Sequence, residues 1–300
     1  MENELKLNNT AIKSSALSKG NLWVVVPIVL LVGLLSVLIY NHHAEFTWNG
    51  FVNGFNEEFL VFFAIGVFAQ LVDGTLGMGY GATSTSFLLA YGVPPVVSST
   101  AVHVSEMFTT GASALSHHRF GNINKKLVKH LLIPGVLGSI TGAYLLSDVI
   151  NGDVIKPFIA VYMIVLAIII IRKALKKSIV KKKTKKLGAL AVFGGFMDSV
   201  GGGGWGPIVT STLLGRGRNP RYTIGSVNAA EFAISFASGI TFMLFGGIHG
   251  WQVIIGLILG GVISAPLGAY LVNKIKRKPM MVAVGVLIIL LSLKTLSKLL

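Results

Sequence analysis

Long apolar runs constrain the fold of this 300-residue chain more than any other feature of its sequence. Residues 22–40 form the first such run, and runs of comparable length recur up to the C-terminus. About 20 consecutive apolar residues are enough for a helix to cross the hydrocarbon core of a membrane. Only 12 % of the residues are charged, whereas soluble domains carry about 25 %. The sequence therefore predicts a helical integral membrane protein.

After the first run, the sequence predicts two kinds of membrane segment. The stretches 58–92 and 187–215 are interrupted by glycines, and each is expected to form two arms of roughly 12 to 15 residues, about 18–22 Å long. Arms of that length are short for a full crossing, so each stretch is either a re-entrant hairpin or a pair of short helices. Both options return the chain to the side from which it entered. The unbroken spans are expected at 96–117, 127–147, 154–173, 222–247, 251–272 and 280–297.

The run at 22–40 has a competing interpretation as a cleaved signal peptide. Lys13 and Lys19 precede it, as the basic residues of a signal peptide would. The run is longer than the apolar core of most signal peptides, however, and no small-x-small cleavage site follows Tyr40. We therefore expect a cytoplasmic tail at 1–21, followed at 22–57 by a retained membrane helix and an external loop.

Basic residues gather in alternate loops, and this distribution predicts the orientation of the chain. They cluster in the N-terminal tail and at 119–129, 172–186, 216–221 and 274–278. Basic loops of membrane proteins face the cytoplasm, so we expect a multi-pass protein of the cytoplasmic (inner) membrane with a cytoplasmic N-terminus. In a soluble protein the net charge of +15 would suggest nucleic-acid binding. Here we expect no nucleic acid, and the most basic cluster is expected to touch anionic lipids.

The second half of the chain repeats the first at an offset of 125 residues. Asp73–Gly81 aligns with Asp198–Gly206, and Glu106 aligns with Glu231. Each half holds one broken stretch and three unbroken spans, and this odd number of crossings inserts the halves in opposite orientations. Inverted repeats with broken helices are typical of secondary transporters.

These patterns predict an all-α fold, a polytopic membrane helical bundle made of two inverted-topology repeats. Each repeat has a glycine-broken helical hairpin plus three spans, and one extra N-terminal helix precedes them. The first transporter repeat is expected at 58–173, a basic cytoplasmic linker at 174–186 and the second, inverted repeat at 187–300.

Four acidic residues fall inside predicted membrane segments and form two repeat-related pairs, Asp73 with Asp198 and Glu106 with Glu231. A carboxylate at the centre of a membrane helix costs about 2.5–3.5 kcal/mol, and such groups usually mark an interior site or an ion path. The aspartates have an alternative role as caps of the short helices after the glycines. The glutamates lie well inside helices, so a function is favoured over a buried structural network.

A polar stripe accompanies Glu106 along one predicted helix face. Its members recur at intervals of three and four residues, which places them on the same side of a helix. Such a stripe is expected to line an interior shared with the matching helix, although hydroxyl groups also permit close helix packing. A histidine one turn from a glutamate is able to pass a proton. The stripe comprises Ser99, His103, Glu106, Thr110, Ser113 and His117, and its counterpart comprises Asn228, Glu231, Ser235 and Ser238.

The glycine runs at 77–81 and 201–206 resemble phosphate-binding loops only superficially, because no strand precedes them and no G-x-x-x-x-G-K-[ST] sequence occurs. Instead, the glycines are expected to unwind the chain and to leave backbone N–H groups free at the start of the next short helix. Free N–H groups and the helix dipole favour an anion. Tyr80 and Trp205 occupy equivalent positions beside the glycines, where they either wall the pocket or pack. The chain has no cysteine, which excludes disulfides and thiol chemistry, and we expect neither a metal site nor a cofactor.

At these residues the sequence resembles the TauE/SafE sulfite exporter family, also called the TSUP family. The resemblance covers about 58–298 and rests on the break Gly202–Pro207, the helix around Glu106 and the loop His117–Asn124. It implies transport of small sulfur oxyanions such as sulfite, thiosulfate or sulfonates, coupled to protons. The first break departs from the family pattern, with Ala82 in place of a proline, and the direction of transport does not follow from the resemblance.

The leading hypothesis is therefore a proton-coupled secondary transporter that holds its anion between the glycine breaks. A cation transporter or channel is the alternative. Four acidic residues are expected inside the bundle, and no Arg or Lys is expected there to balance their charge. A membrane enzyme or structural subunit is disfavoured, since no nucleophile–base set is present. The predicted substrate-binding set is Gly77, Gly79, Tyr80, Gly81, Thr83, Thr85, His103, Gly202, Gly204, Trp205, Gly206, Thr210 and Asn228. The predicted proton-coupling set is Glu106, Glu231, His103, Asp73 and Asp198.

Overall fold

The computed structural model describes residues 55–119, 121–175, 186–247, 249–271 and 276–299, together with Gly33 and Ser36. The chain divides into two units, Met1–Phe51 and Val52–Leu300, and the fold below is that of the second unit. Nearly all of the predicted N-terminal helix at 22–40 and of the linker at 174–186 lies outside the described residues.

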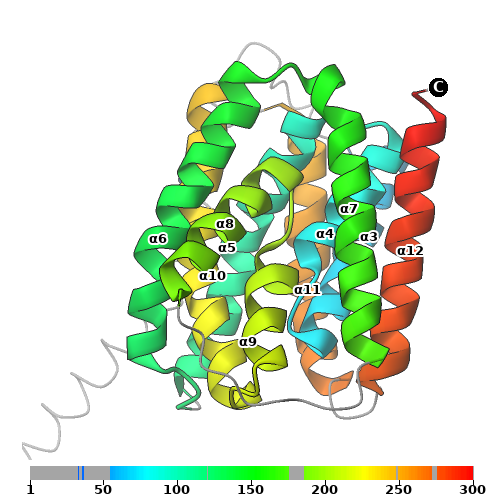
Figure 1. Ribbon diagram of the computed structural model, residues 1–300. Helices are drawn as coiled ribbons and strands as arrows, with labels where there is room; N and C mark the ends of the chain where they lie inside the picture. The colour runs from blue at the N-terminus through cyan, green and yellow to red at the C-terminus, as the bar shows by residue number, and fades with distance from the viewer. Residues whose placement is uncertain are drawn as a thin grey trace, which may run out of the picture. The chain divides into compact units, whose positions relative to one another are not determined.

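Every regular element in the described part of the chain is helical, which confirms the predicted all-α class (Figure 1). Five of these helices are long and apolar enough to cross a membrane, namely α3, α6 with its continuation, α7, α10 and α12. The first half comprises α3 (Glu57–Leu76), α4 (Tyr80–Tyr91), α5 (Pro95–Arg119), α6 (Lys125–Tyr144) with the π-helical turn η1 (Leu145–Val149), and α7 (Gly152–Leu175). The second comprises α8 (Leu187–Gly201), the π-helical turn η2 (Gly206–Thr210), α9 (Ser211–Gly215), α10 (Pro220–Phe245), α11 (Trp251–Leu271) and α12 (Arg277–Ser297).

The helix α3 is longer than the sequence predicted. It begins at Glu57, directly after the N-cap residue Asn56. The Asn56 side chain accepts a hydrogen bond from the backbone N–H of Phe59 at 3.1 Å, and two glutamates occupy the first turn. Both features stabilise a helix start. The resulting 20 residues span about 30 Å, so the expectation of a short first arm was wrong here. The other arms are short, with 12 residues in α4 and 15 in α8.

Both helix breaks occur where glycines adopt left-handed backbone conformations. Gly77 ends α3 with φ 71° and Gly79 precedes α4 with φ 108°, whereas Gly202 and Gly203 follow α8 with φ 70° and 151°. Residues with a Cβ rarely adopt these angles. The glycine runs therefore place the breaks where the sequence predicted them.

Helices of the two halves exchange partners in the bundle. The first arm of each half packs against the other half: α3 packs on α11, and α8 packs on α6. Likewise, α5 packs on α10 and α7 on α12, as Figure 1 shows for the last pair. This exchange is the pattern that a two-fold relation between the halves would produce. Their opposite orientation in the membrane stays a prediction.

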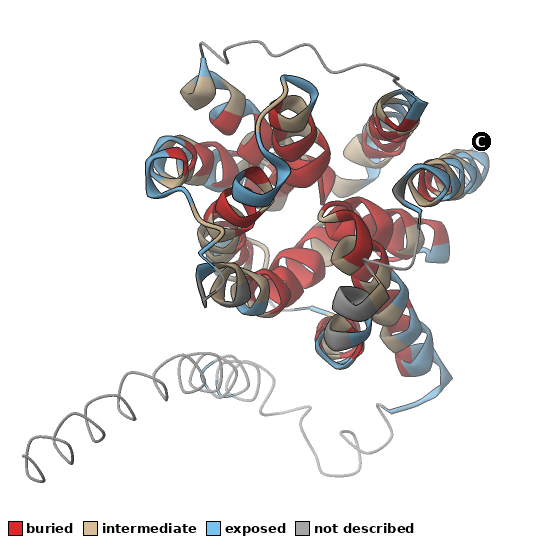
Figure 2. Cartoon of the chain, turned by 90° about the horizontal axis from the view of Figure 1, so that it is seen from below, coloured by how far each residue is buried: buried red, intermediate tan, exposed pale blue. Residues whose placement is uncertain are grey.

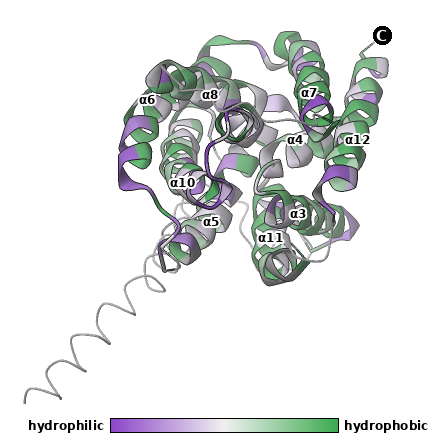
Figure 3. Ribbon diagram, turned by 60° about the horizontal axis from the view of Figure 1, so that its bottom comes forward, coloured by the Kyte–Doolittle hydropathy of each residue, from purple (hydrophilic) through white to green (hydrophobic). Residues whose placement is uncertain are grey.

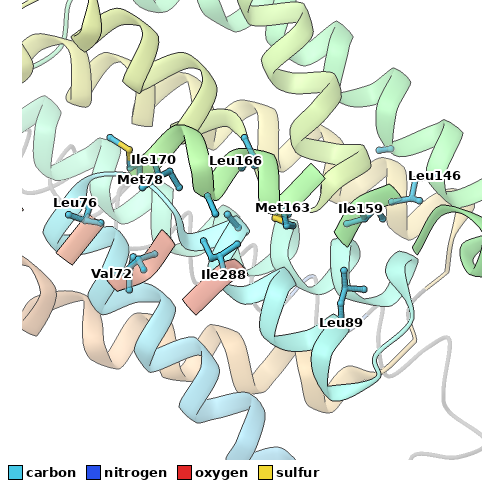
Figure 4. Packing of buried hydrophobic residues seen from close by; sticks show 14 of the residues in the cluster. Val72, Leu76, Met78, Leu89, Leu146, Ile159, Met163, Leu166, Ile170 and Ile288 are labelled. Atoms are coloured by element: carbon cyan, nitrogen blue, oxygen red, sulfur yellow. The ribbon is translucent and has the colours of Figure 1, made fainter. Parts of the chain in front are cut away.

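A buried apolar cluster joins α3, α4, α7 and α12 beside the first break. Val72, Leu89, Met163, Leu166 and Ile288 belong to it (Figure 4). A second cluster on α6, α8 and α10 surrounds the second break. Together the two clusters fix the positions of the breaks at the centre of the bundle, where Figure 2 shows the buried residues concentrated.

The outward surface of the bundle is apolar. Leu60, Ile133, Phe158, Ile263 and Leu290 each expose more than half of their side-chain surface, and hydrophobic residues colour α6, α7 and α12 along most of their length (Figure 3). Soluble monomers rarely expose apolar surface on this scale. The surface therefore suits contact with lipid.

Candidate functional site

The two glycine breaks touch each other through their backbones. A methyl group placed on Gly203 would lie 2.8 Å from Cα of Gly81 and closer still to the backbone of Ala82. One placed on Gly206 would lie 2.9 Å from Cβ of Met78. Because side chains are missing at these points, segments 125 residues apart in sequence meet at the centre of the bundle.

Asp198 caps the helical turn that follows the second break. Its Oδ1 accepts hydrogen bonds from the backbone N–H of Gly204 at 2.7 Å and of Trp205 at 2.8 Å. Asp73 accepts a hydrogen bond from the backbone N–H of Tyr80, the residue equivalent to Trp205. Contrary to expectation, the N–H groups of Gly204 and Trp205 are therefore not free for a substrate in this conformation, because a carboxylate of the chain itself already occupies the anion position.

The second oxygen of Asp198 faces a histidine. Its Oδ2 lies 3.3 Å from Nε2 of His103, and both side chains are buried. The other ring nitrogen of His103, Nδ1, lies 2.8 Å from the carbonyl oxygen of Ser99. A carbonyl only accepts hydrogen bonds, so Nδ1 carries a proton and Nε2 of the neutral ring has a lone pair. The lone pair of Nε2 and the carboxylate oxygen repel each other at this distance unless one of the two carries a proton.

Glu106 completes this buried group. It offers a ligand atom within 4.8 Å of those of His103 and Asp198, and its Oε2 accepts a hydrogen bond from the hydroxyl of Ser235 at 3.2 Å. Oε1 lies 3.0 Å from the point where a methyl group on Gly81 would sit. The His103–Glu106–Asp198 group thus combines residues of both halves at the meeting point of the breaks.

The remaining predicted coupling residues lie at the edge of this group. Glu231 and Asp73 are only half-buried, and Glu231 interacts electrostatically with Glu106 and Asp198. The equivalent glutamates, Glu106 and Glu231, therefore have different neighbours. One turn before Glu106, α5 carries His103, whereas α10 carries Asn228 at the equivalent position.

Several buried hydroxyl groups near the breaks make no hydrogen bond within the described part of the chain. Two of them, on Thr83 and Thr210, belong to the predicted substrate-binding set. A buried hydroxyl without a partner loses free energy unless a ligand or water pairs with it. These groups are therefore available to donate hydrogen bonds to an anion. The hydroxyls are those of Thr83, Ser99, Ser199 and Thr210.

Other members of the predicted binding set have structural partners. The hydroxyl of Thr85 donates to the carbonyl of Gly202 and so joins the two breaks. Asn228 donates to the hydroxyl of Ser113 at 2.8 Å. The rings of Tyr80 and Trp205 are buried, with Tyr80 hydrogen-bonded to Ser105 at 3.0 Å and Trp205 donating to a backbone carbonyl. For these two aromatic residues the structure favours the packing alternative.

Comparison with known proteins identifies the family. Residues 62–295 match the family described as "Sulfite exporter TauE/SafE". The chain belongs to the TauE/SafE family. It is 43 % identical over 250 residues to "Probable membrane transporter protein YtnM" of Bacillus subtilis (strain 168), covering 80 % of this chain and 83 % of that protein. It is 26 % identical over 239 residues to "Probable membrane transporter protein ORF9" of Sinorhizobium sp, covering 76 % and 89 %. No solved structure matches the chain.

These relatives establish the class of this TauE/SafE protein. It is a multi-pass membrane transporter and not an enzyme. The all-α, polytopic membrane class and the family that the sequence predicted are both confirmed, whereas the inverted orientation of the repeats stays a prediction.

Two residues of this TauE/SafE chain at the second break were missed by the sequence analysis, and both lie on α7. The hydroxyl of Tyr162 donates to the carbonyl of Gly203 at 3.3 Å; because Pro207 lacks an N–H group, this carbonyl has no helical partner. The ammonium of Lys173 donates to the carbonyl of Pro207 at 3.3 Å and to the hydroxyl of Ser211. The expectation of an interior without lysine was therefore wrong. The apolar run around Tyr162 gave no signal for its contact, and Lys173 was counted with the basic cluster at 172–186.

Proposed function

We propose that this protein moves small sulfur-containing oxyanions, of the sulfite, thiosulfate or sulfonate type, across the cytoplasmic membrane by proton-coupled alternating access. The family description, which names sulfite export, supports the substrate class. The observation that carries the proposal is the contact between the two breaks, with the His103–Glu106–Asp198 group and unpaired hydroxyls beside it. The N-terminus is cytoplasmic in this proposal.

The hydroxyls of Thr83, Thr210 and Ser99 are the proposed donors to the anion. They are buried and unpaired, and hydroxyl donors bind an oxyanion without requiring a net positive charge. The glycines of the two breaks let the backbones approach closely enough for hydroxyls from both halves to reach one ligand.

Protons are the proposed coupling ion because an acidic interior repels an anion. One ligand atom each of Glu106, Asp198 and His103 lie within 4.8 Å of one another, and like-charged neighbours favour proton uptake. Protonation of this group removes negative charge as the anion binds. Glu106, His103 and Asp198 carry the proton in this scheme, and Asp73 and Glu231 extend the proton path.

Alternating access would follow from movement of one half against the other at the breaks. The contacts there involve glycine backbones, which do not interlock as side chains do. Rocking of two repeats around a fixed site is the general mechanism of inverted-repeat transporters. Either direction of anion transport is compatible with this geometry.

Flux of labelled thiosulfate into proteoliposomes tests the proposal. Thiosulfate is the preferred probe because sulfite itself takes up protons near neutral pH. We expect an inward-acidic or outward-acidic pH gradient to change the wild-type rate at least severalfold, and we expect Glu106→Gln to abolish this dependence. Glu58→Gln, at the exposed start of α3, is the control that removes a carboxylate elsewhere. A thiosulfate flux rate that changes neither with the pH gradient nor with Glu106→Gln would contradict coupling at this group.

Transport of a cation is the alternative function, and one observation favours it. The ligand atoms of His103, Glu106 and Asp198 lie within 4.8 Å of one another, and imidazole with carboxylate is a donor set that binds divalent transition metals. Stabilisation of the purified protein against heat by Zn²⁺ or Mn²⁺, together with no stabilisation by thiosulfate or sulfite, would support the alternative over the anion transporter.

A further inference from the structure

Lys173 brings a positive charge to the second break. It lies in the last turn of α7, and its side chain is half-buried. The ammonium donates hydrogen bonds to the carbonyl of Pro207 in η2 and to the hydroxyl of Ser211 in α9. Lys173 therefore links the last helix of the first half to the broken arm of the second half.

The partners of this ammonium are neutral. Within the described ranges, no carboxylate lies at ion-pair distance from Lys173. A half-buried cation pairs with a carboxylate in most proteins, because burial of an unpaired charge costs free energy. An ammonium with only neutral partners retains its attraction for an anion.

The corresponding lysine of the second half makes a different contact. Lys298, which is 125 residues further along, donates to the carbonyl of Ala90 at the end of α4 at 3.0 Å. Ser86 and Ser211 are also equivalent: their hydroxyls donate to the carbonyls of Ala82 and Pro207. Only the serine of the second break also receives an ammonium among the described contacts, so this charge is a feature of one arm rather than of both.

The ammonium lies close to the proposed substrate site. Ser211 directly follows Thr210, whose buried hydroxyl is unpaired. Ser211 also lies five residues from Gly206, which contacts the first break. Five residues of helix correspond to about 8 Å. An anion that moves along this arm would therefore travel only about 8 Å between the breaks and the residue that Lys173 contacts.

We propose that the Lys173 ammonium and the Ser211 hydroxyl form a second subsite for a sulfur oxyanion, on the arm η2–α9. This inference rests on the proposed function. An oxygen of the anion replaces the carbonyl of Pro207 as the acceptor of two hydrogen bonds, one from the Lys173 ammonium and one from the Ser211 hydroxyl. The ammonium supplies the positive charge that the acidic centre lacks.

Thiosulfate binding to the purified full-length protein in detergent, measured by titration calorimetry, tests the subsite. Loss of one charge-assisted hydrogen bond weakens binding about tenfold or more, so we expect that change in Kd for Lys173→Met. Lys173→Arg keeps the charge and is expected to restore most of the affinity. Two controls are expected to match the wild type: Lys298→Met, which removes the equivalent lysine, and Arg172→Gln, which removes an exposed neighbouring charge.

A purely structural role for Lys173 predicts a different result. If the ammonium only satisfied the carbonyl of Pro207, Lys173→Met would lower the melting temperature of the ligand-free protein without changing the Kd for thiosulfate, and that outcome would overturn the subsite. An equal loss of affinity in Arg172→Gln would overturn it too, because the effect would then be general electrostatics.

Two further measurements distinguish failure of the subsite from misfolding of the variant and from failure of the proposed function. If Lys173→Met does not fold, Ser211→Ala keeps the charge and removes the hydroxyl, and we expect a severalfold weaker Kd; an unchanged Kd overturns the subsite. Wild-type protein that binds neither thiosulfate nor sulfite would overturn the proposed function and the subsite together. Wild-type binding with an unchanged Kd in Lys173→Met would overturn the subsite alone.

Discussion

At the scale of single residues, the two carboxylate oxygens of Asp198 make different contacts. Oδ1 caps the N–H groups of Gly204 and Trp205, and Oδ2 faces His103. The sequence predicted both a capping and a coupling role for this residue and left them as alternatives. The structure shows the capping contact directly, whereas coupling stays a proposal. Sequence spacing alone could not have paired Asp198 with His103, because the two lie on different helices of different halves.

Substitution of Asp198 separates these roles. Asp198→Asn keeps an oxygen for the cap and removes the charge opposite His103, so we expect a small change in melting temperature and loss of the pH-gradient dependence of thiosulfate flux. Asp198→Ala also removes the cap, which costs about 1–2 kcal/mol of stability. We therefore expect a distinctly lower melting temperature for Asp198→Ala than for Asp198→Asn. Equal melting temperatures would contradict the capping role.

At the scale of helices, the breaks are the elements that the sequence predicted best. Glycine readily adopts a positive φ, so the glycine runs predict the positions of the helix breaks from the sequence alone. The length of α3 was misjudged at its end rather than at its start, because the helix continues through Asp73 to Leu76 and ends only at Gly77. The contacts of α7 with the second break were also hidden, since they depend on how two distant helices pack.

Alanine at Gly203 tests the contact between the breaks. Gly203 and Gly92 both have positive φ, but a methyl group on Gly203 would meet the backbone of Ala82 whereas one on Gly92 would meet nothing within 4 Å. Backbone strain is therefore common to both variants, at about 1 kcal/mol. We expect Gly92→Ala to retain thiosulfate flux with slightly reduced thermal stability. Gly203→Ala is expected to be less stable than Gly92→Ala and to lose flux; equal behaviour of the two variants would show that the contact is not required.

At the scale of the whole molecule, the internal repeat predicted which helices correspond, and the bundle shows how they exchange partners between halves. The offset of 125 residues could not predict the differences between the halves. His103 has Asn228 as its counterpart, and Lys173 and Lys298 bind different carbonyls. The two halves therefore present different side chains and contacts at equivalent positions.

The central claim is that two oppositely oriented halves meet at their glycine breaks to form the transport site, and labelling of single cysteines in whole cells tests it most directly. The chain has no cysteine, so a maleimide reacts only with a cysteine that is introduced. Lys125→Cys at the start of α6 and His249→Cys just before α11 introduce one at two exposed and nearly equivalent positions. We expect a membrane-impermeant maleimide applied outside to label His249→Cys and to label Lys125→Cys only after the membrane is opened. Labelling of both positions from the same side would place the halves in parallel and contradict the account.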